Sequence, residues 1–137
     1  MSTSILDVVF LDKGYSSDRK FILCTKDGAR YLLRTSDLAD EARRRTEFDN
    51  LEIVWRSGVR CPEPLGFGVD GECSVCYMLL TYICGECAED SLKGLPPAKR
   101  YAVGCEAAEE LLKIHRAIEP AERVEDSARI PFRQRPD

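Results

Sequence analysis

The sequence lacks the features that mark a protein for export, for a membrane or for nucleic acid. No apolar run approaches the roughly 20 residues that a membrane-spanning helix requires. No basic segment precedes the short apolar run near the N-terminus, so a signal peptide is not expected. The formal net charge of -4 argues against a nucleic-acid partner. These absences favour a cytoplasmic protein that binds neither membranes nor nucleic acid.

The size and composition are those of one ordinary globular domain. The chain has 137 residues, 44% of them hydrophobic and 32% charged, without internal repeats. A domain of this length buries about two-thirds of its unfolded surface and needs no disulfides. The seven cysteines form an odd number in a chain without an export signal, so we interpret them as reduced thiols.

The first third of the chain predicts an antiparallel meander followed by a helix. Three β-rich runs are joined by short turns, and Asp27-Gly28 is typical of a tight hairpin. The runs are Ile5–Leu11, Lys20–Thr25 and Arg30–Thr35. A helix is then expected from a cap at Ser36 or Asp37 to Gly58.

The predicted helix has an apolar face and a basic run. We expect the face to consist of Leu38, Ala42, Phe48, Leu51 and Trp55. We interpret Arg43–Arg45 as a solvated surface, with Glu41 and Arg45 spaced as an exposed ion pair.

The remaining sequence predicts two strands and a second helix. Leu65–Val69 and Ser74–Ile83 flank a turn at Asp70-Gly71, and the second of these strands is expected to be the longest of the five. A polar connector leads to a helix over Ala98–Ile118, closed by Pro120, with Val103, Ala107, Leu111 and Ile114 on one face.

Residues 73–87, CSVCYMLLTYICGEC, carry two Cys-x-x-Cys pairs, a spacing typical of zinc sites. The spacer contains no turn former, and as a strand it would separate Cys76 from Cys84 by roughly 26 Å. Four sulfurs bound to one zinc ion lie within roughly 4 Å of each other. We therefore favour simple thiols, and keep a zinc module and a redox pair at Cys84 and Cys87 as alternatives.

The order of these elements and six phrases resemble the N-terminal lobe of the aminoglycoside phosphotransferase family, which has a protein-kinase-like fold. The phrases cover about residues 13–120: GYSSDRKF, RYLLRTSD, the EF of RRRTEFDNL, GVRCPEPLGFG, VCYMLLTYICGE and AAEELLKIHRAIEP. The resemblance implies an α+β fold with a five-stranded antiparallel sheet and one packed helix. It places this lobe at 1–83, a hinge and the first helix of a C-terminal lobe at 84–120, and a disordered tail at 121–137.

The resemblance also implies a nucleotide site. The loop with Gly14, Ser16 and Ser17 would lie over the phosphates, since glycine allows close approach and serine donates hydrogen bonds. It is not a Walker loop, because G-x-x-x-x-G-K-[ST] is absent. Arg34 would take the place of the usual strand lysine on the phosphates, and Glu47 would orient it as an ion pair.

The adenine would lie at the end of the last strand. Leu80 would stand behind the ring, and the main chain of Tyr82 and Ile83 would hydrogen-bond its edge. Leu6 and Leu32 are weaker candidates for apolar contacts with the ring.

The catalytic loop H-R-D-L-x-x-x-N and the D-F-G segment of kinases are absent. The only histidine, His115, begins no such loop, and the resemblance makes it structural. We therefore expect no catalytic or metal-binding residue in this chain, and a truncated lobe of a small-molecule O-phosphotransferase that is inactive alone. ATP or GTP with Mg²⁺ would be the cofactor, with the metal held mainly by the missing lobe, and a small-molecule hydroxyl would be the acceptor. A non-catalytic kinase-like binding module is the alternative.

Overall fold

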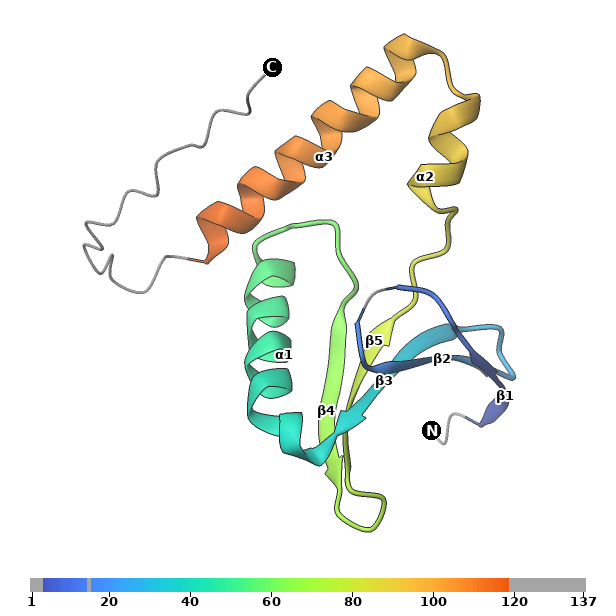
Figure 1. Cartoon of the computed structure of the whole chain (residues 1–137), viewed down its shortest axis with the longest axis vertical. Coiled ribbons are helices and arrows are strands. Elements are labelled where there is room, and N and C mark those ends of the chain that lie inside the picture. Colours follow the sequence, from blue (N-terminus) through green and yellow to red (C-terminus); the bar gives the residue numbers. More distant parts are fainter. Residues whose placement is uncertain (1–3, 15, 119–137) are drawn as a thin grey trace, which may run out of the picture.

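The computed structural model describes residues 4–14 and 16–118 (Figure 1). Five strands form one antiparallel sheet in the order β1-β2-β3-β5-β4. The strands are β1 (Ile5–Phe10), β2 (Arg19–Thr25), β3 (Arg30–Asp37), β4 (Pro64–Asp70) and β5 (Val75–Thr81). The predicted α+β fold and antiparallel meander are confirmed. The tail expected over 121–137, and Pro120 before it, lie outside the described residues.

The hairpin between β2 and β3 forms where Asp27-Gly28 predicts it. Gly28 has a φ of 85°, a left-handed conformation that favours glycine. Its amide donates to the Thr25 carbonyl over 3.0 Å, and the Thr25 amide donates to the Ala29 carbonyl over 3.0 Å. This turn fixes the register of β2 against β3, which places Lys20 opposite Arg34.

One helix covers part of one face of the sheet. The 3-10 turn η1 (Leu38–Asp40) leads into α1 (Glu41–Arg56), which packs against β3, β4 and β5. The Asp37 side chain accepts a hydrogen bond of 2.9 Å from the Ala39 amide, so the cap expected at Ser36 or Asp37 is Asp37. The Gly58 amide donates to the Trp55 carbonyl just after the helix, where its φ is 82°.

The predicted faces of α1 were partly wrong. Ala42 and Trp55 are exposed, whereas Arg44 and Val54 are the two buried residues of the helix. The face that meets the sheet runs through positions 44, 47, 51 and 54, which follow the helical repeat. The interpretation of the arginine run as solvated holds for Arg43 and Arg45 and fails for Arg44, which is buried against the carboxylates of Asp18 and Glu47.

The core lies between α1 and the centre of the sheet. Alternate residues of β5, namely Cys76, Met78 and Leu80, are buried on the face toward α1, together with Val54 and Val59. Strand β5 spans 7 residues and β3 spans 8, so the expectation that β5 is the longest strand was wrong. Strand β5 begins at Val75, directly after Ser74, whose φ is a positive 53°. It ends at Thr81, the last residue paired with β3.

After β5 the chain leaves the sheet and returns as a long helix (Figure 1). The connector contains α2 (Ala88–Ser91) and the 3-10 turn η2 (Leu92–Gly94), and α3 (Pro97–Ala117) then packs beside α1. The apolar face expected on α3 is largely exposed: Val103, Ala107 and Leu111 are open to solvent and Ile114 is half-buried. No helix in residues 4–14 and 16–118 has both the length and the apolar character required to cross a bilayer.

Candidate nucleotide site

Arg34 lies on the face of the sheet that α1 covers, at the boundary of the covered area. It is paired with Met78 of β5 on one side and with Lys20 of β2 on the other. Paired residues of antiparallel strands point to the same face, so all three side chains belong to the face of α1. The Arg34 side chain is 17% exposed, and its Nη1 lies 3.8 Å from the Met78 sulfur.

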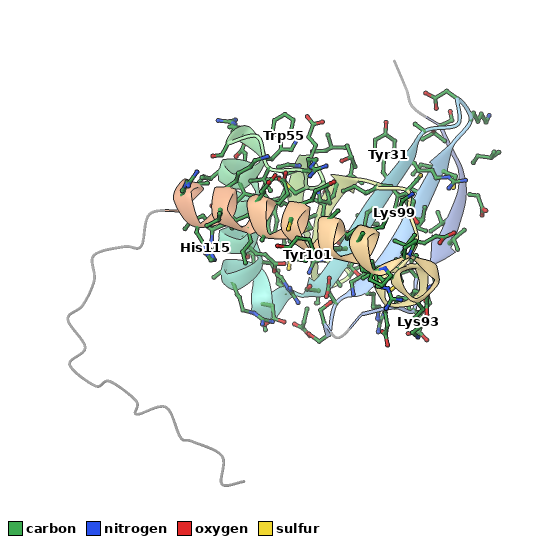
Figure 2. All side chains as sticks on the ribbon, turned by 90° about the horizontal axis from the view of Figure 1, so that it is seen from above. Tyr31, Trp55, Lys93, Lys99, Tyr101 and His115 are labelled. Atoms are coloured by element: carbon green, nitrogen blue, oxygen red, sulfur yellow. The ribbon has the colours of Figure 1, made fainter. Side chains whose placement is uncertain are left out.

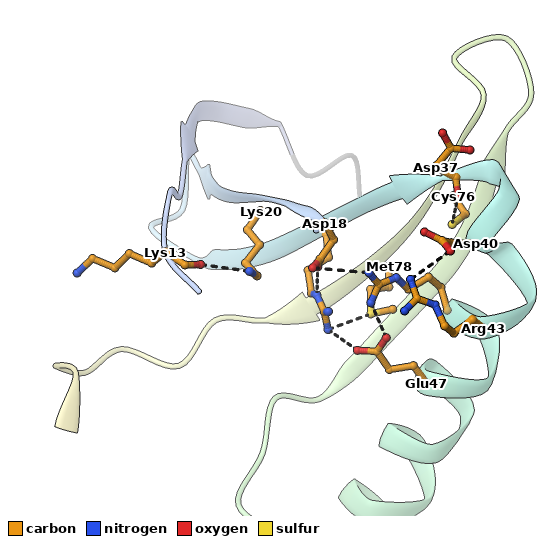
Figure 3. Close-up of polar contacts among 11 residues, drawn as sticks. Lys13, Asp18, Lys20, Asp37, Asp40, Arg43, Glu47, Cys76 and Met78 are labelled. Carbon is orange, nitrogen blue, oxygen red and sulfur yellow. Dashed lines mark hydrogen bonds and ion pairs between the residues drawn. The ribbon is translucent and has the colours of Figure 1, made fainter. Parts of the chain in front are cut away.

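Two carboxylates hold the Arg34 guanidinium (Figure 3). Nη1 donates to Glu47 Oε1 over 2.9 Å, so the ion pair expected between these residues is present. Nε donates to Asp18 Oδ2 over 2.5 Å. Asp18 comes from the end of the glycine-serine loop and Glu47 from the middle of α1, so the guanidinium joins three separate elements.

Arg44 closes this group into a ring. Its Nη1 donates to Glu47 Oε2 over 2.8 Å, and its Nη2 lies 3.8 Å from Asp18 Oδ1. The side chains of Asp18 and Arg44 are only 1% and 7% exposed, and Asp18 Oδ1 and Arg44 Nε are buried without a hydrogen bond in the described residues. We call these four residues, Asp18, Arg34, Arg44 and Glu47, the buried ion cluster. Its two cations and two carboxylates balance each other.

The members of the cluster shift each other's ionisation. Burial opposes ionisation of Asp18, but hydrogen bonds from Arg34 and Ser16 and the charge of Arg34 together outweigh it and lower the pKa of this carboxyl to about 2. Burial also opposes ionisation of Glu47, whose pKa is lowered by Arg44 and Arg34. Burial disfavours the charged form of Arg34, yet both carboxylates raise the pKa of its guanidinium. These three groups are therefore charged at neutral pH.

The resemblance pointed to Arg34 and Glu47 but missed Asp18 and Arg44. One signal for Asp18 was available: it directly precedes β2, two residues before Lys20, which pairs with Arg34. For Arg44 the signal was its spacing of three from Glu47 on one helix face.

The loop between β1 and β2 lies at the same end of the sheet as the cluster. Gly14 has a φ of 104°, and the Leu11 amide donates to the Lys20 carbonyl over 2.9 Å at the base of the loop. Ser16 and Ser17 are exposed, and Ser17 lines a polar cavity of about 390 Å³ with Arg19 and Thr35. Their contact with phosphate stays a prediction.

The residues predicted at the adenine lie at the other end of β5. Leu80 is 3% exposed and is paired with Leu32, two residues before Arg34. The main chain of Tyr82 and Ile83 follows the strand and forms no hydrogen bond within the described residues. Leu6, on the edge strand β1, is 67% exposed. Met78, opposite Arg34, is about 10 Å along the strand from Thr81, which separates the end of β5 from the ion cluster.

The cysteine-rich segment is a strand in its centre. Cys76 is buried in β5, with its Sγ 3.5 Å from the Asp37 carbonyl oxygen, and burial raises the pKa of its thiol. Cys73, Cys84 and Cys87 are exposed on either side of the strand, and Cys87 directly precedes α2. In residues 4–14 and 16–118 no three His, Cys, Asp or Glu side chains are grouped so that they could hold a metal ion.

Together these features define a lobe of the protein-kinase-like fold: a five-stranded antiparallel sheet, one packed helix whose carboxylate meets a strand cation, and a connector after the last strand. The sequence model of the phosphotransferase enzyme family matches residues 7–137, so the chain belongs to this family. No curated protein matches the chain significantly.

Proposed function

We propose that this chain binds ATP or GTP on the α1 face of its sheet, as the nucleotide-binding lobe of a small-molecule O-phosphotransferase. Family membership supports phosphoryl transfer in general. The choice of nucleotide, an alcohol group as acceptor, an aminoglycoside or related antibiotic as substrate, and a cytoplasmic location are parts of the proposal.

The observation that carries the proposal is the ion pair between Arg34 and Glu47. In phosphoryl transfer the protein contributes positioning and charge stabilisation, and a strand cation paired with a helix carboxylate is a recurring part of such sites. Arg34 keeps its charge at every physiological pH, and a guanidinium can hold phosphate oxygens through more than one N–H group. Glu47 fixes its direction from α1 at 2.9 Å.

The hinge would supply the base contacts. Tyr82 and Ile83 keep free main-chain donors and acceptors within the described residues, and such groups recognise the polar edge of a purine. Leu80 and Leu32 form an apolar pair on the same face, two residues from the level of Arg34. The exposed residues Gly14, Ser16 and Ser17 would then lie over the phosphates.

The chemical step would depend on groups outside the described lobe. Mg²⁺, when bound with the nucleotide, neutralises charge that develops on the phosphates. Its usual carboxylate ligands do not gather in residues 4–14 and 16–118. His115 lies in the last turn of α3 and is exposed. We therefore propose binding without turnover for these 137 residues.

Calorimetric titration of the purified chain with ATP, GTP and adenosine tests the proposal. The expected result is binding of one nucleotide per chain, with triphosphates bound more tightly than adenosine. Arg34→Met should weaken triphosphate binding at least tenfold if the cation positions the phosphates. Arg43→Met is the matched control, because Arg43 lies in an exposed pair with Asp40. Absence of any nucleotide binding by the folded wild-type chain would contradict the proposal.

A further inference from the structure

The charge of Arg34 is already compensated before any ligand arrives. Two of its nitrogens, Nε and Nη1, are engaged by Asp18 and Glu47, and only Nη2 has no recorded partner in the described residues. The second cation of the cluster, Arg44, balances the remaining carboxylate charge. A triphosphate carries several negative charges, so a neutral cluster alone supplies little attraction for it.

Lys20 is the neighbouring cation on the same face, and its charge has no such counterpart. It is paired with Arg34 across β2 and β3, which places the two side chains on one face of the sheet. None of the ion pairs within residues 4–14 and 16–118 includes Lys20. Its Nζ donates to the Lys13 carbonyl oxygen over 3.1 Å, which leaves two of its three N–H donors for other partners.

The Lys20 ammonium lies against the main chain at Lys13, where the chain leaves β1 (Figure 3). A Cβ atom added at Gly14 would lie 2.9 Å from Lys20 Nζ, closer than side-chain atoms pack. The left-handed φ of 104° at Gly14 also favours glycine. A glycine at this position therefore leaves room for the Lys20 ammonium beside the main chain of Lys13 and Gly14.

We propose that Lys20 is the cation that binds the nucleotide phosphates, and that Arg34 is held by Asp18 and Glu47 mainly as an oriented donor beside it. This inference rests on the proposed function of the site. A lysine ammonium is a compact, strongly hydrated point charge with rotatable donors, which suits a phosphate that enters between the loop and the sheet. The ligand class is a nucleoside di- or triphosphate, and the base contributes nothing to this contact.

Calorimetry with ATP and with adenosine on the wild-type chain and four variants tests this inference. Lys20→Gln removes the charge but keeps a donor for the Lys13 carbonyl, and Lys20→Met removes both. Lys20→Arg keeps the charge. Lys26→Gln is the matched control, because Lys26 is an exposed lysine just after the other end of β2. Circular dichroism spectra and thermal unfolding of each variant show whether it is folded.

The expected result is a loss of ATP affinity of at least tenfold in Lys20→Gln and Lys20→Met, with adenosine affinity unchanged. Lys20→Arg should stay within about threefold of wild type, Lys26→Gln within about twofold, and the salt dependence of ATP binding should become shallower without the Lys20 charge. A folded Lys20→Gln chain that binds ATP like wild type overturns the inference and leaves the proposed function intact. A wild-type chain that binds adenosine but gains nothing from the phosphates overturns the inference as well. A wild-type chain that binds neither ligand overturns the proposed function itself.

Discussion

The two halves of the α1 face of the sheet differ in what covers them. Over β3, β5 and β4 the helix buries Cys76, Met78 and Leu80, and the buried ion cluster lies at the edge of this covered half. Over β1 and β2 no comparable helix packs among the described residues, and β1 exposes each of its residues. Figure 2 shows α1, in blue-green, on one side of the molecule and the blue strand β1 on the other. The contrast separates two roles on one sheet: the covered half carries the core, and the open half, where Lys20 and Ile22 are only half-buried, is where we propose that the ligand binds.

The largest loss of stability is expected when a charge is removed from the buried ion cluster in the covered half. Asp18→Asn leaves two buried cations with a single carboxylate, and breaking a buried ion pair costs about 3–5 kcal/mol. Urea unfolding of the variant should show this loss. The matched control, Arg43→Ala, removes only an exposed pair with Asp40 and should cost less than about 1 kcal/mol. Equal effects of the two substitutions would mean that the cluster has no special role in stability.

A core substitution gives the next largest effect. Leu80→Ala removes a side chain that is 3% exposed under α1, and such truncations cost about 2–5 kcal/mol. The same change at Leu6, which is 67% exposed on β1, should cost less than about 1 kcal/mol. Thermal and urea unfolding compare the two variants. A destabilisation by Leu6→Ala as large as that by Leu80→Ala would show that β1 is covered in solution.

Low pH should destabilise the fold, because the carboxylates of the same cluster become protonated. The pKa of Asp18 is lowered from 3.8 to about 2, so its contribution is fully present above about pH 4 and is lost as the pH falls through about 2. At about 1.4 kcal/mol per pKa unit, this contribution is about 2 kcal/mol. Glu47, whose pKa is also lowered, acts in the same direction. Unfolding free energies measured from pH 6 to pH 2 should fall more steeply for wild type than for Asp18→Asn, and parallel curves would contradict this assignment.

The smallest effect on unfolding free energy is expected for the contacts between α3 and Arg60, which follows α1. Arg60 donates to Glu110 over 3.0 Å and lies 3.4 Å from Glu106, and the hydrogen bonds from Lys113 and Arg60 lower the pKa of Glu110 to about 2. Since α3 has no buried residue, Arg60→Ala should leave global unfolding nearly unchanged and speed amide exchange in α3. Unchanged exchange rates in α3 would show that other contacts hold this helix.

Much of the fold follows from local signals in the sequence. The Asp27-Gly28 hairpin, the Asp37 cap and the alternation of Cys76, Met78 and Leu80 each depend on neighbours in the chain. The burial of Arg44 does not, because it requires Asp18, which lies in the loop before β2 and far away in the sequence, to come close to the helix. The end of β5 at Thr81 likewise depends on the length of its partner β3. The exposure of the apolar face of α3 depends on which neighbours pack against it, which its own periodicity does not contain.

In the candidate site, too, some residues could be predicted from the sequence and others could not. The resemblance supplied Arg34 and Glu47 because both lie within recognisable phrases, and their contact at 2.9 Å is present. It gave no reason to consider Lys20, because the role that we propose for that residue depends on the compensation of Arg34 by Asp18, a contact that only the folded chain shows.

Amide and side-chain NMR spectra of the full chain during ATP titration test the central claim most directly. Binding on the open half of the α1 face predicts shifts at Gly14, Ser16, Ser17, Tyr82 and Ile83 and at the side chains of Lys20 and Arg34, with Leu6 and Leu32 shifting less. Tyr77, which points to the opposite face of the sheet, should stay unchanged. Shifts confined to the opposite face or to α3, or no shifts at saturating ATP, would contradict the account.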